Sequence, residues 1–272
     1  MMPRTVAAQP DESLTAQFDA AGLDWIVPAW DAPRHVHAFF TTRDNARSEH
    51  APPSRAQPGE RLNAFDVARR SMDDLASRAK PFLPAPVLWL DQVHGSSVLD
   101  VDSATLCDGE LPRADAALTR KTDRVLAVRV ADCVPVLLTD CDGSVVAIAH
   151  AGWRGLAAGI LENTVAAMGC DPTRVVAWLG PAIGRTAFEV GDEVRAAFVT
   201  TDAAATQAFV AGQPGKWHAD LVALARQRLA RAGVSDVTAD GGCTASEPRR
   251  FLSFRRDRTT QRMAAFIWRN PA

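Results

Sequence analysis

The sequence predicts a mixed α+β fold in which two β-sheets pack together. Runs of apolar and β-branched residues recur along the chain, and the runs at 125–130, 134–139 and 145–149 follow one another closely, as strands do. Apolar residues at helical spacing fill other segments, among them 65–80 and 156–168. These helices are too few to cover both faces of one large sheet, which favours two sheets that cover each other.

The expected elements follow in order along the chain. Residues 1–33 mix prolines and acidic residues with an apolar patch at 23–30, and we interpret them as a lead-in with an edge strand. Residues 34–272 contain no repeat, low-complexity linker or charge run, so we expect a single domain there. Its expected strands are 34–42, 87–90, 97–101, 114–119, 125–130, 134–139, 145–149, 174–179, 234–239, 251–256 and 263–268, and its expected helices are 65–80, 156–168, 189–198 and 219–232.

Prolines and glycines mark the ends of several elements. Pro81 follows the first expected helix directly, and Gly169 and Gly233 follow the second and the fourth, where a helix commonly stops. Residues 44–59 contain three prolines and no periodic pattern, so we expect a loop there.

The composition is that of an ordinary globular protein, with 272 residues of which 47% are hydrophobic and 23% charged. A net charge of -2 gives no argument for a nucleic-acid or membrane partner. Charges interrupt every apolar stretch before it reaches membrane-spanning length, and the first residues lack the apolar region of a signal peptide. We therefore expect a cytoplasmic protein, as a monomer or a small homo-oligomer.

Two imidazoles and a thiol stand at the ends of predicted strands. Cys133 lies between the runs 125–130 and 134–139, His150 follows the run 145–149, and His94 follows the run 87–90. Strand ends that lead into glycine-bearing loops are common places for chemistry in such folds. We interpret the three residues as one site, with Asp132 next to Cys133 able to orient a ligand or move a proton.

Zinc takes imidazole and thiolate ligands together, and catalytic zinc has three protein ligands and one open position. His94, Cys133 and His150 are too far apart in sequence for a zinc finger and suit ligands gathered from separate strands. With an open position the metal would lower the pKa of a bound water toward about 7. The alternative is that Cys133 and the two histidines are ordinary buried side chains.

Several arginines could bind an anion. Arg154 lies in Gly152-Trp153-Arg154-Gly155 ahead of a predicted helix, where backbone N–H groups attract phosphate, or the segment is only a tight turn with a solvated arginine. Arg43 at a strand end has the same two interpretations. Arg255 and Arg256 are adjacent in an expected strand, so at most one of them faces a given site.

These residues also carry a family resemblance. The strings WLDQVHGSSVLDV, ADAALTRKTDRVLAVRVADCVPVLLTD, VAIAHAGWRGLAAGI, WLGPAIGRTAFEVGDEV and FLSFRRD resemble the laccase-domain (YfiH-like) family over roughly residues 36–268. Its members have been called multicopper polyphenol oxidases, purine nucleoside phosphorylases and peptidoglycan editing factors. The resemblance implies zinc bound by His94, Cys133 and His150. It also implies two mixed sheets packed face to face with helices outside, in α/β/β/α layers.

The activity that the resemblance implies is phosphorolysis of purine nucleosides, namely adenosine, inosine, guanosine or methylthioadenosine, with adenosine deamination as a companion. Purine nucleosides and inorganic phosphate are then the partners. Arg43, Arg154 and Arg255 are candidates to bind the phosphate, and Gln92 is a candidate for a hydrogen bond to the substrate.

The sequence departs from the family pattern in two loops. Family members usually carry two glycines after the segment that ends at Arg43, where this chain reads Asp44-Asn45-Ala46-Arg47. After Asp257 they usually carry Gly-x-x-Gly-Arg, where this chain reads Arg258-Thr259-Thr260-Gln261-Arg262. Both changes bear on the substrate range and on the role of Arg43.

Three other interpretations remain open. A cysteine hydrolase would use Cys133 as nucleophile with His150 or His94 as base, on a peptidoglycan precursor such as a UDP-muramyl amino acid. A copper polyphenol oxidase is disfavoured by the total of 6 histidines, because multicopper sites need many more. A non-catalytic binding protein stabilised by zinc would close the ligand shell with Cys243 or Asp132.

Overall fold

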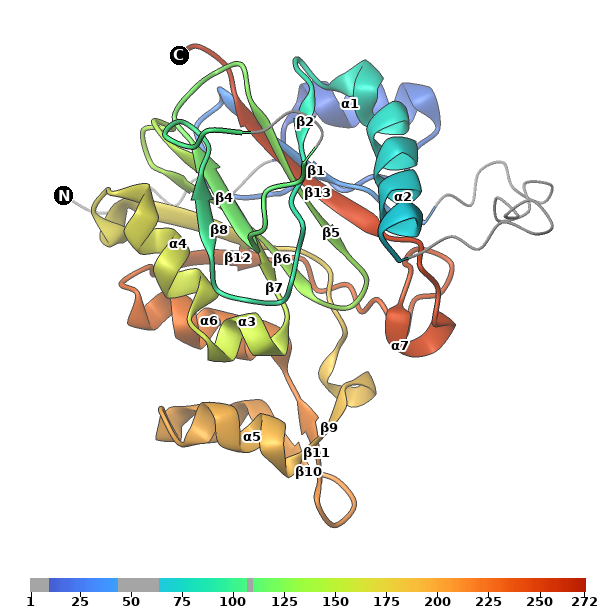
Figure 1. The fold of residues 1–272 in the computed structure, drawn as a ribbon, viewed down its shortest axis with the longest axis vertical. Helices are drawn as coiled ribbons and strands as arrows, with labels where there is room; N and C mark the ends of the chain where they lie inside the picture. The colour runs from blue at the N-terminus through green and yellow to red at the C-terminus, as the bar shows by residue number, and fades with distance from the viewer. Residues whose placement is uncertain (1–9, 44–63, 107–109) are drawn as a thin grey trace.

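Two mixed β-sheets lie face to face at the centre of the fold (Figure 1). The structure is a computed structural model that describes residues 10–43, 64–106 and 110–272. In the four-stranded sheet the order is β1 (Val36–Phe40), β13 (Met263–Arg269), β5 (Val125–Val130) and β2 (Val87–Leu88). Its pairs are antiparallel except for β2 and β5.

The six-stranded sheet contains the central run of the sequence. Its order is β12 (Asp236–Ala239), β8 (Val175–Leu179), β6 (Val134–Asp140), β7 (Val146–Ala151), β4 (Ala116–Thr119) and β3 (Val98–Asp100). The two outer pairs, β12 with β8 and β3 with β4, are parallel, and the inner pairs are antiparallel. A third sheet, β10 (Phe209–Ala211), β11 (Lys216–Ala219) and β9 (Glu189–Gly191), lies with the helix α5 (Asp192–Val199) at one end of the molecule (Figure 1).

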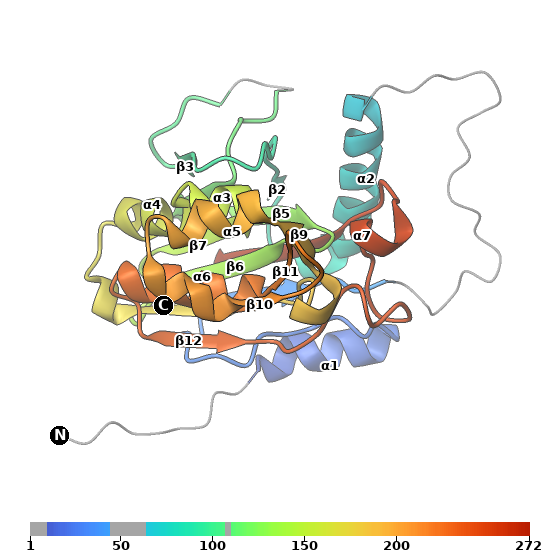
Figure 2. The same cartoon turned by 90° about the horizontal axis from the view of Figure 1, so that it is seen from below.

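Strand periodicity divides the side chains between two cores. In β7, Val146 and Ile148 point into the layer between the two large sheets, while Ala147 and Ala149 point to the opposite face. Because both faces of such a strand are buried, its sequence is a continuous run of apolar residues and does not alternate with polar ones. Helices complete the burial on the outer face of each sheet (Figure 2). The predicted α+β fold with α/β/β/α layers is therefore confirmed.

The helices belong to two groups. On the four-stranded sheet lie α1 (Glu12–Ala21) and α2 (Ala64–Ala79), and on the six-stranded sheet lie α3 (Trp153–Ala157), α4 (Ile160–Met168) and α6 (Leu221–Arg231). The helix α5 extends the second group and packs against the third sheet. A short helix α7 (Phe254–Asp257) and 3-10 turns at Lys80–Phe82, Pro172–Arg174, Arg185–Ala187 and Ala203–Ala208 complete the described elements. No described helix is long and apolar enough to cross a membrane.

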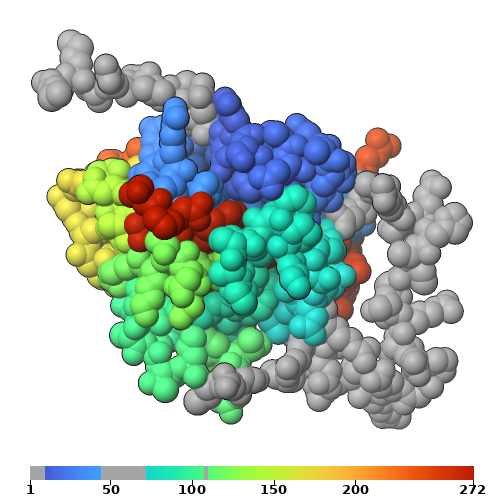
Figure 3. Space-filling view, turned by 90° about the horizontal axis from the view of Figure 1, so that it is seen from above, coloured from blue at the N-terminus to red at the C-terminus, as the bar shows by residue number. Residues whose placement is uncertain are grey.

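The two ends of the described chain meet on one face of the molecule. Strand β1 pairs with β13 along its whole length, and the Asn270 backbone N–H donates to the His35 carbonyl at 2.8 Å. Figure 3 shows the C-terminal segment in red against the N-terminal segment in blue. Ile26, within the expected lead-in, also joins this sheet through a bridge to Phe40. The domain boundary expected after residue 33 stays a prediction.

Four local expectations differ from the structure. The first is the lead-in, which contains the helix α1. Asp11 caps the start of this helix, and Gly22, at φ 68°, ends it. Of the expected edge strand, only a single bridge at Ile26 is present. The second is the helix 156–168, which is interrupted at Gly159, whose φ of 89° lies in the left-handed region. The third is the helix 189–198, whose first residues form β9.

The fourth difference is the strand expected at 251–256, which is wrong because α7 begins there. The Ser253 hydroxyl accepts from the Arg256 N–H at 3.2 Å, and the Asp257 carboxylate accepts from the Ser253 N–H at 3.2 Å. This reciprocal capping favours a helical turn over an extended segment. The loop expected at 44–59, with Asp44 and Arg47, lies outside the described residues.

We predict that Ile148→Ala lowers the free energy of unfolding by about 2–5 kcal/mol, because it removes a fully buried side chain from between the two sheets. Val210→Ala is the control, since Val210 is 47% exposed, and we expect it to cost about 0.5 kcal/mol or less. Denaturant unfolding measures both. Equal losses would contradict the assigned inter-sheet core.

Candidate metal centre

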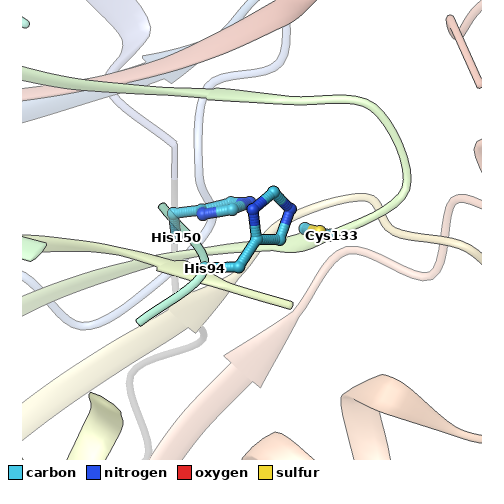
Figure 4. A group of neighbouring side chains, drawn as sticks. All are labelled: His94, Cys133 and His150. Atoms are coloured by element: carbon cyan, nitrogen blue, oxygen red, sulfur yellow. The ribbon is translucent and has the colours of Figure 1, made fainter. Parts of the chain in front are cut away.

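His94, Cys133 and His150 come together at one end of the six-stranded sheet (Figure 4). His94 lies in the turn after β2, Cys133 directly precedes β6, and His150 lies in β7, the antiparallel neighbour of β6. Their ligand atoms all lie within 4.8 Å of one another. His150 is buried, Cys133 is half-buried and His94 is exposed, so the group is open to solvent on the side of His94.

The backbone around this group is tightly constrained. His94 has φ 60° and Asp132 has φ 92°, a left-handed conformation that costs free energy in non-glycine residues. A Cβ atom at Gly152 would lie 2.9 Å from the Cys133 sulfur, and one at Gly155 would lie 2.9 Å from the Gly95 carbonyl oxygen. Both glycines are therefore needed for close packing of β7 and α3 against the turn that carries His94.

Asp115 organises the group and was missed in the sequence. It is fully buried just ahead of β4, and its carboxylate accepts hydrogen bonds from the backbone N–H groups of His94 at 2.9 Å and Gly95 at 2.6 Å. It also accepts from Val93 N–H at 3.2 Å and from the His150 ring at 2.9 Å. In the sequence, Asp115 is a lone acidic residue at the start of an apolar run. An acidic residue in such a place is expected to be buried, and a buried carboxylate requires hydrogen-bond donors around it.

The hydrogen bonds decide the charge of Asp115. Burial would raise its pKa, but the bonds from His150 and from the backbone of Gly95 and His94 outweigh burial and lower it. Asp115 is therefore ionised and can only accept, so the His150 Nδ1 carries a proton toward it. This orients the imidazole with its Nε2 toward the ligand group, as carboxylates do behind metal-bound histidines.

Cys133 and His150 form a coupled pair. Burial would raise the pKa of the Cys133 thiol, but the charge of His150 and hydrogen bonds from His150 and His94 lower it to about 6. Burial would lower the pKa of His150, but the charge of Cys133 and the bond to Asp115 raise it to about 9. Without a metal the pair is thus a thiolate and an imidazolium at neutral pH.

Two imidazole nitrogens and a thiolate form a donor set that suits zinc and other transition metals of similar softness. The residues proposed as a fourth ligand do not belong to the group. Cys243 accepts from the Gly184 N–H at 3.2 Å, and the Asp132 carboxylate accepts from the Thr244 hydroxyl at 2.7 Å and the Arg255 N–H at 2.7 Å. Within the described residues the group therefore has three donors and an open side.

The expected substrate residues have other contacts in the structure. The Gln92 side chain donates to the Arg129 carbonyl at 2.8 Å and accepts from the Arg129 N–H at 2.9 Å, which continues the pairing of β2 with β5. Arg154 is exposed, with its guanidinium 4.6 Å from the centre of the Trp153 ring. Neither contact engages the three metal-ligand candidates.

Arg43 and Arg255 are likewise engaged. Arg43 forms an ion pair with Asp257 at 2.6 Å, and Arg255 donates to the Glu189 carbonyl at 3.0 Å. Arg255 and Arg256 lie in α7, so the expectation that they point to opposite faces of a strand is wrong. Arg256 instead donates to the backbone carbonyls of Thr244 and Phe251, which fixes the loops behind Asp132.

We predict that Asp115→Asn weakens binding of Zn²⁺ about 10- to 100-fold, because an amide cannot accept from every donor around Asp115 and no longer orients His150. Competition with a chromophoric chelator measures the affinity. Asp142→Asn is the matched control at an exposed surface pair with Arg174. An affinity unchanged in Asp115→Asn would contradict the orienting role.

We predict that Asp257→Asn destabilises the protein at pH 7 and that this difference disappears in acid. The hydrogen bond from Arg256 lowers the pKa of Asp257 from 3.8 to about 2 in the folded state. A carboxyl whose pKa is lowered on folding stabilises above its unfolded pKa, and that stabilisation is lost as the pH falls through about 2. Urea unfolding between pH 7 and pH 2 measures it. A difference independent of pH would contradict the ionic origin.

Comparison with known families gives a consistent result. The family described as multi-copper polyphenol oxidoreductase laccase matches residues 37–270. A purine nucleoside phosphorylase of Xylella fastidiosa (strain Temecula1) is 45% identical over 251 residues, which cover 90% of this chain and 96% of that protein. The purine nucleoside phosphorylase YfiH of Escherichia coli (strain K12) is 44% identical, covering 89% of this chain and 98% of that protein.

Solved structures show the same fold. A Neisseria meningitidis protein of family DUF152 is 40% identical and superposes with a TM-score of 0.78, covering 91% of this chain and 100% of that one. YlmD from Geobacillus stearothermophilus is 27% identical with a TM-score of 0.70, covering 87% of this chain and 93% of that one.

Proposed function

Because the chain belongs to the multi-copper polyphenol oxidoreductase laccase family, and curated relatives bear the name purine nucleoside phosphorylase, we propose that it is a zinc-dependent purine nucleoside phosphorylase. The observation that supports this most directly is the group of His94, Cys133 and His150 with its open side. The chain covers nearly the whole length of these relatives, so the comparison concerns the entire enzyme.

The residues of the group fit zinc as the resident metal, with His94, Cys133 and His150 as ligands. When bound, zinc supplies a Lewis acid on the open side of the site. Asp115 holds the turn of His94 and the ring of His150 in place before any ligand arrives, so little reorganisation is needed. Copper would use the same ligands and is the alternative metal.

The proposed reaction joins inorganic phosphate to adenosine, inosine, guanosine or methylthioadenosine. A phosphate oxygen forms a bond to the ribose C1′ while the bond from C1′ to the purine nitrogen breaks. The electron pair of that bond passes to the purine, which takes up a proton, and the products are a ribose 1-phosphate and the free base. The chain must therefore hold an anion beside the metal centre and supply or admit one proton.

Two further activities use the same residues. Adenosine deamination would hydrolyse the exocyclic amine at the same centre and requires no phosphate. A cysteine hydrolase acting on a cell-wall precursor is favoured by one observation, the pKa of about 6 for Cys133 beside His150, which is typical of an activated thiol. The second differs from the phosphorylase because it requires no metal.

We predict that the zinc-loaded protein converts adenosine to adenine only when phosphate is present, and that His94→Ala lowers the rate at least about 100-fold, since a ligand of the metal is lost. Chromatography separates adenine, inosine and hypoxanthine. His218→Ala, in β11 of the third sheet, is the matched histidine control and should retain the wild-type rate.

Three results would redirect the proposal. Inosine formed without phosphate would make deamination the main activity. Activity that survives removal of zinc but is lost in Cys133→Ser would favour the cysteine hydrolase. A zinc-loaded protein that turns over no purine nucleoside would overturn the phosphorylase.

A further inference from the structure

Arg262 lies next to the metal centre, although no sequence pattern singled it out as a site residue. It directly precedes β13, and the first residue of that strand, Met263, pairs with Val130 at the end of β5. Beyond Val130 the chain turns through Asp132 to Cys133. The strand register therefore places Arg262 at the end of the four-stranded sheet at which β5 leads into the loop that carries Cys133.

Local contacts hold the Arg262 side chain but leave part of it available. Its Nη1 donates to the carbonyls of Thr259 and Gln261, both at 2.8 Å, and its guanidinium lies 5.6 Å from the centre of the Phe254 ring. Within the described residues, neither its Nε nor its Nη2 forms a hydrogen bond, and no carboxylate forms an ion pair with it. A half-buried guanidinium held in this way presents an edge with two donors, which matches the geometry of a phosphate.

The electrostatic surroundings show which charges Arg262 faces. Burial lowers the pKa of Arg262. The negative charges of Cys133 and Asp132 offset part of this effect, but the pKa stays below its usual value. Asp132 is already engaged by Thr244 and the Arg255 N–H, and Cys133 would be neutralised in part by the metal. Burial and then the charge of Arg262 lower the pKa of Arg129, while the charge of Asp91 raises it, and Arg129 lies opposite Ala264 in the pairing of β5 with β13.

The three arginines expected to bind phosphate are less suited. Arg43 is neutralised by Asp257, and the Arg255 side chain donates to the Glu189 carbonyl. Arg154 is exposed over Trp153 and is held by no hydrogen bond from its side chain among the described residues. Arg262 differs from Arg43 in having no carboxylate partner among the described residues, and from Arg154 in being half-buried. Arg255 is also half-buried, but its guanidinium extends to the Glu189 carbonyl and the Phe188 ring.

We propose that Arg262 binds the inorganic phosphate that attacks the nucleoside, through the Nε and Nη2 edge of its guanidinium. This inference rests on the proposed phosphorylase function. Arg262 positions the phosphate and stabilises its charge while one of its oxygens forms the bond to C1′ and the purine leaves with the electron pair and a proton. No oxidant or further co-reactant is needed.

Phosphate binding to zinc-loaded protein tests the proposal without relying on turnover. Isothermal calorimetry should show that Arg262→Gln raises the Kd for inorganic phosphate at least tenfold. Arg258→Gln is the matched control, because Arg258 also lies over the Phe254 ring, at 5.4 Å, but is exposed. We expect Arg258→Gln to change the Kd less than twofold. In kinetics, the KM for phosphate should rise in Arg262→Gln while the KM for the nucleoside stays within twofold.

Arg262→Lys covers the case in which Arg262→Gln does not fold. It keeps the positive charge but loses the planar pair of donors, and we expect about a tenfold weaker Kd from the loss of the bidentate contact. Unchanged phosphate binding in Arg262→Lys and Arg262→Gln would overturn the proposal, as would an equal loss in Arg258→Gln or a wild-type protein that binds no phosphate. Phosphate binding that depends on Arg262 in a protein without phosphorolysis would support the anion site and overturn only the phosphorylase.

Discussion

A buried carboxylate holds the site together. Asp115 has no exposed surface and yet stays ionised, because four N–H donors surround it, three from the turn at 93–95 and one from the His150 ring. Removing an isolated carboxylate from water costs roughly several kcal/mol, and a set of donors such as this one is needed to offset that cost. The donors come from two separate segments of the chain, so Asp115 joins the turn of His94 to β7. The distance between the two histidines follows from this one residue.

Close packing imposes a second constraint on the same segments. The turn of His94 can approach β7 and α3 only because Gly152 and Gly155 lack side chains. His94 and Asp132, the residue before Cys133, both have a left-handed backbone. Such strain persists where surrounding contacts enforce it, here the bonds of Asp115 to the first turn and of Thr244 and Arg255 to the second. The site is therefore built before any ligand binds.

Much of the fold follows from the sequence, because periodicity reports burial. The runs at 125–130 and 134–139 became β5 and β6 with almost the same bounds, since both faces of these strands are covered. Elements fixed by capping were harder to predict. The α1 helix depends on Asp11 and Gly22, and α7 depends on the reciprocal bonds of Ser253 and Asp257, whose apolar sequence context is typical of a strand.

The residues of the candidate site likewise include some that the sequence predicts and some that it does not. His94, Cys133 and His150 could be grouped from strand ends and from the family resemblance, and the structure brings them together, although their role as ligands stays a prediction. The role of Asp115 could not be predicted, because it depends on which N–H groups surround the carboxylate in three dimensions. The role proposed for Arg262 likewise rests on its three-dimensional surroundings, although the residue coincides with the arginine of the family pattern after Asp257. Gln92 shows the opposite case, since its place beside His94 in sequence suggested the substrate while its amide pairs with the Arg129 backbone.

The coupling between Cys133 and His150 connects the metal to the choice among activities. In the metal-free site the pair holds a proton on the His150 Nε2, the atom that a metal requires, so metal binding must release that proton. The metal-free and metal-bound forms then differ in the state of Cys133. The metal-free form contains a thiolate with an adjacent imidazolium, whereas in the metal-bound form Cys133 and His150 would both be ligands. The proposed metal-dependent phosphorylase and the alternative thiol-dependent hydrolase would thus use the metal-bound and the metal-free form of one arrangement, and the affinity for the metal at neutral pH would separate the two proposals.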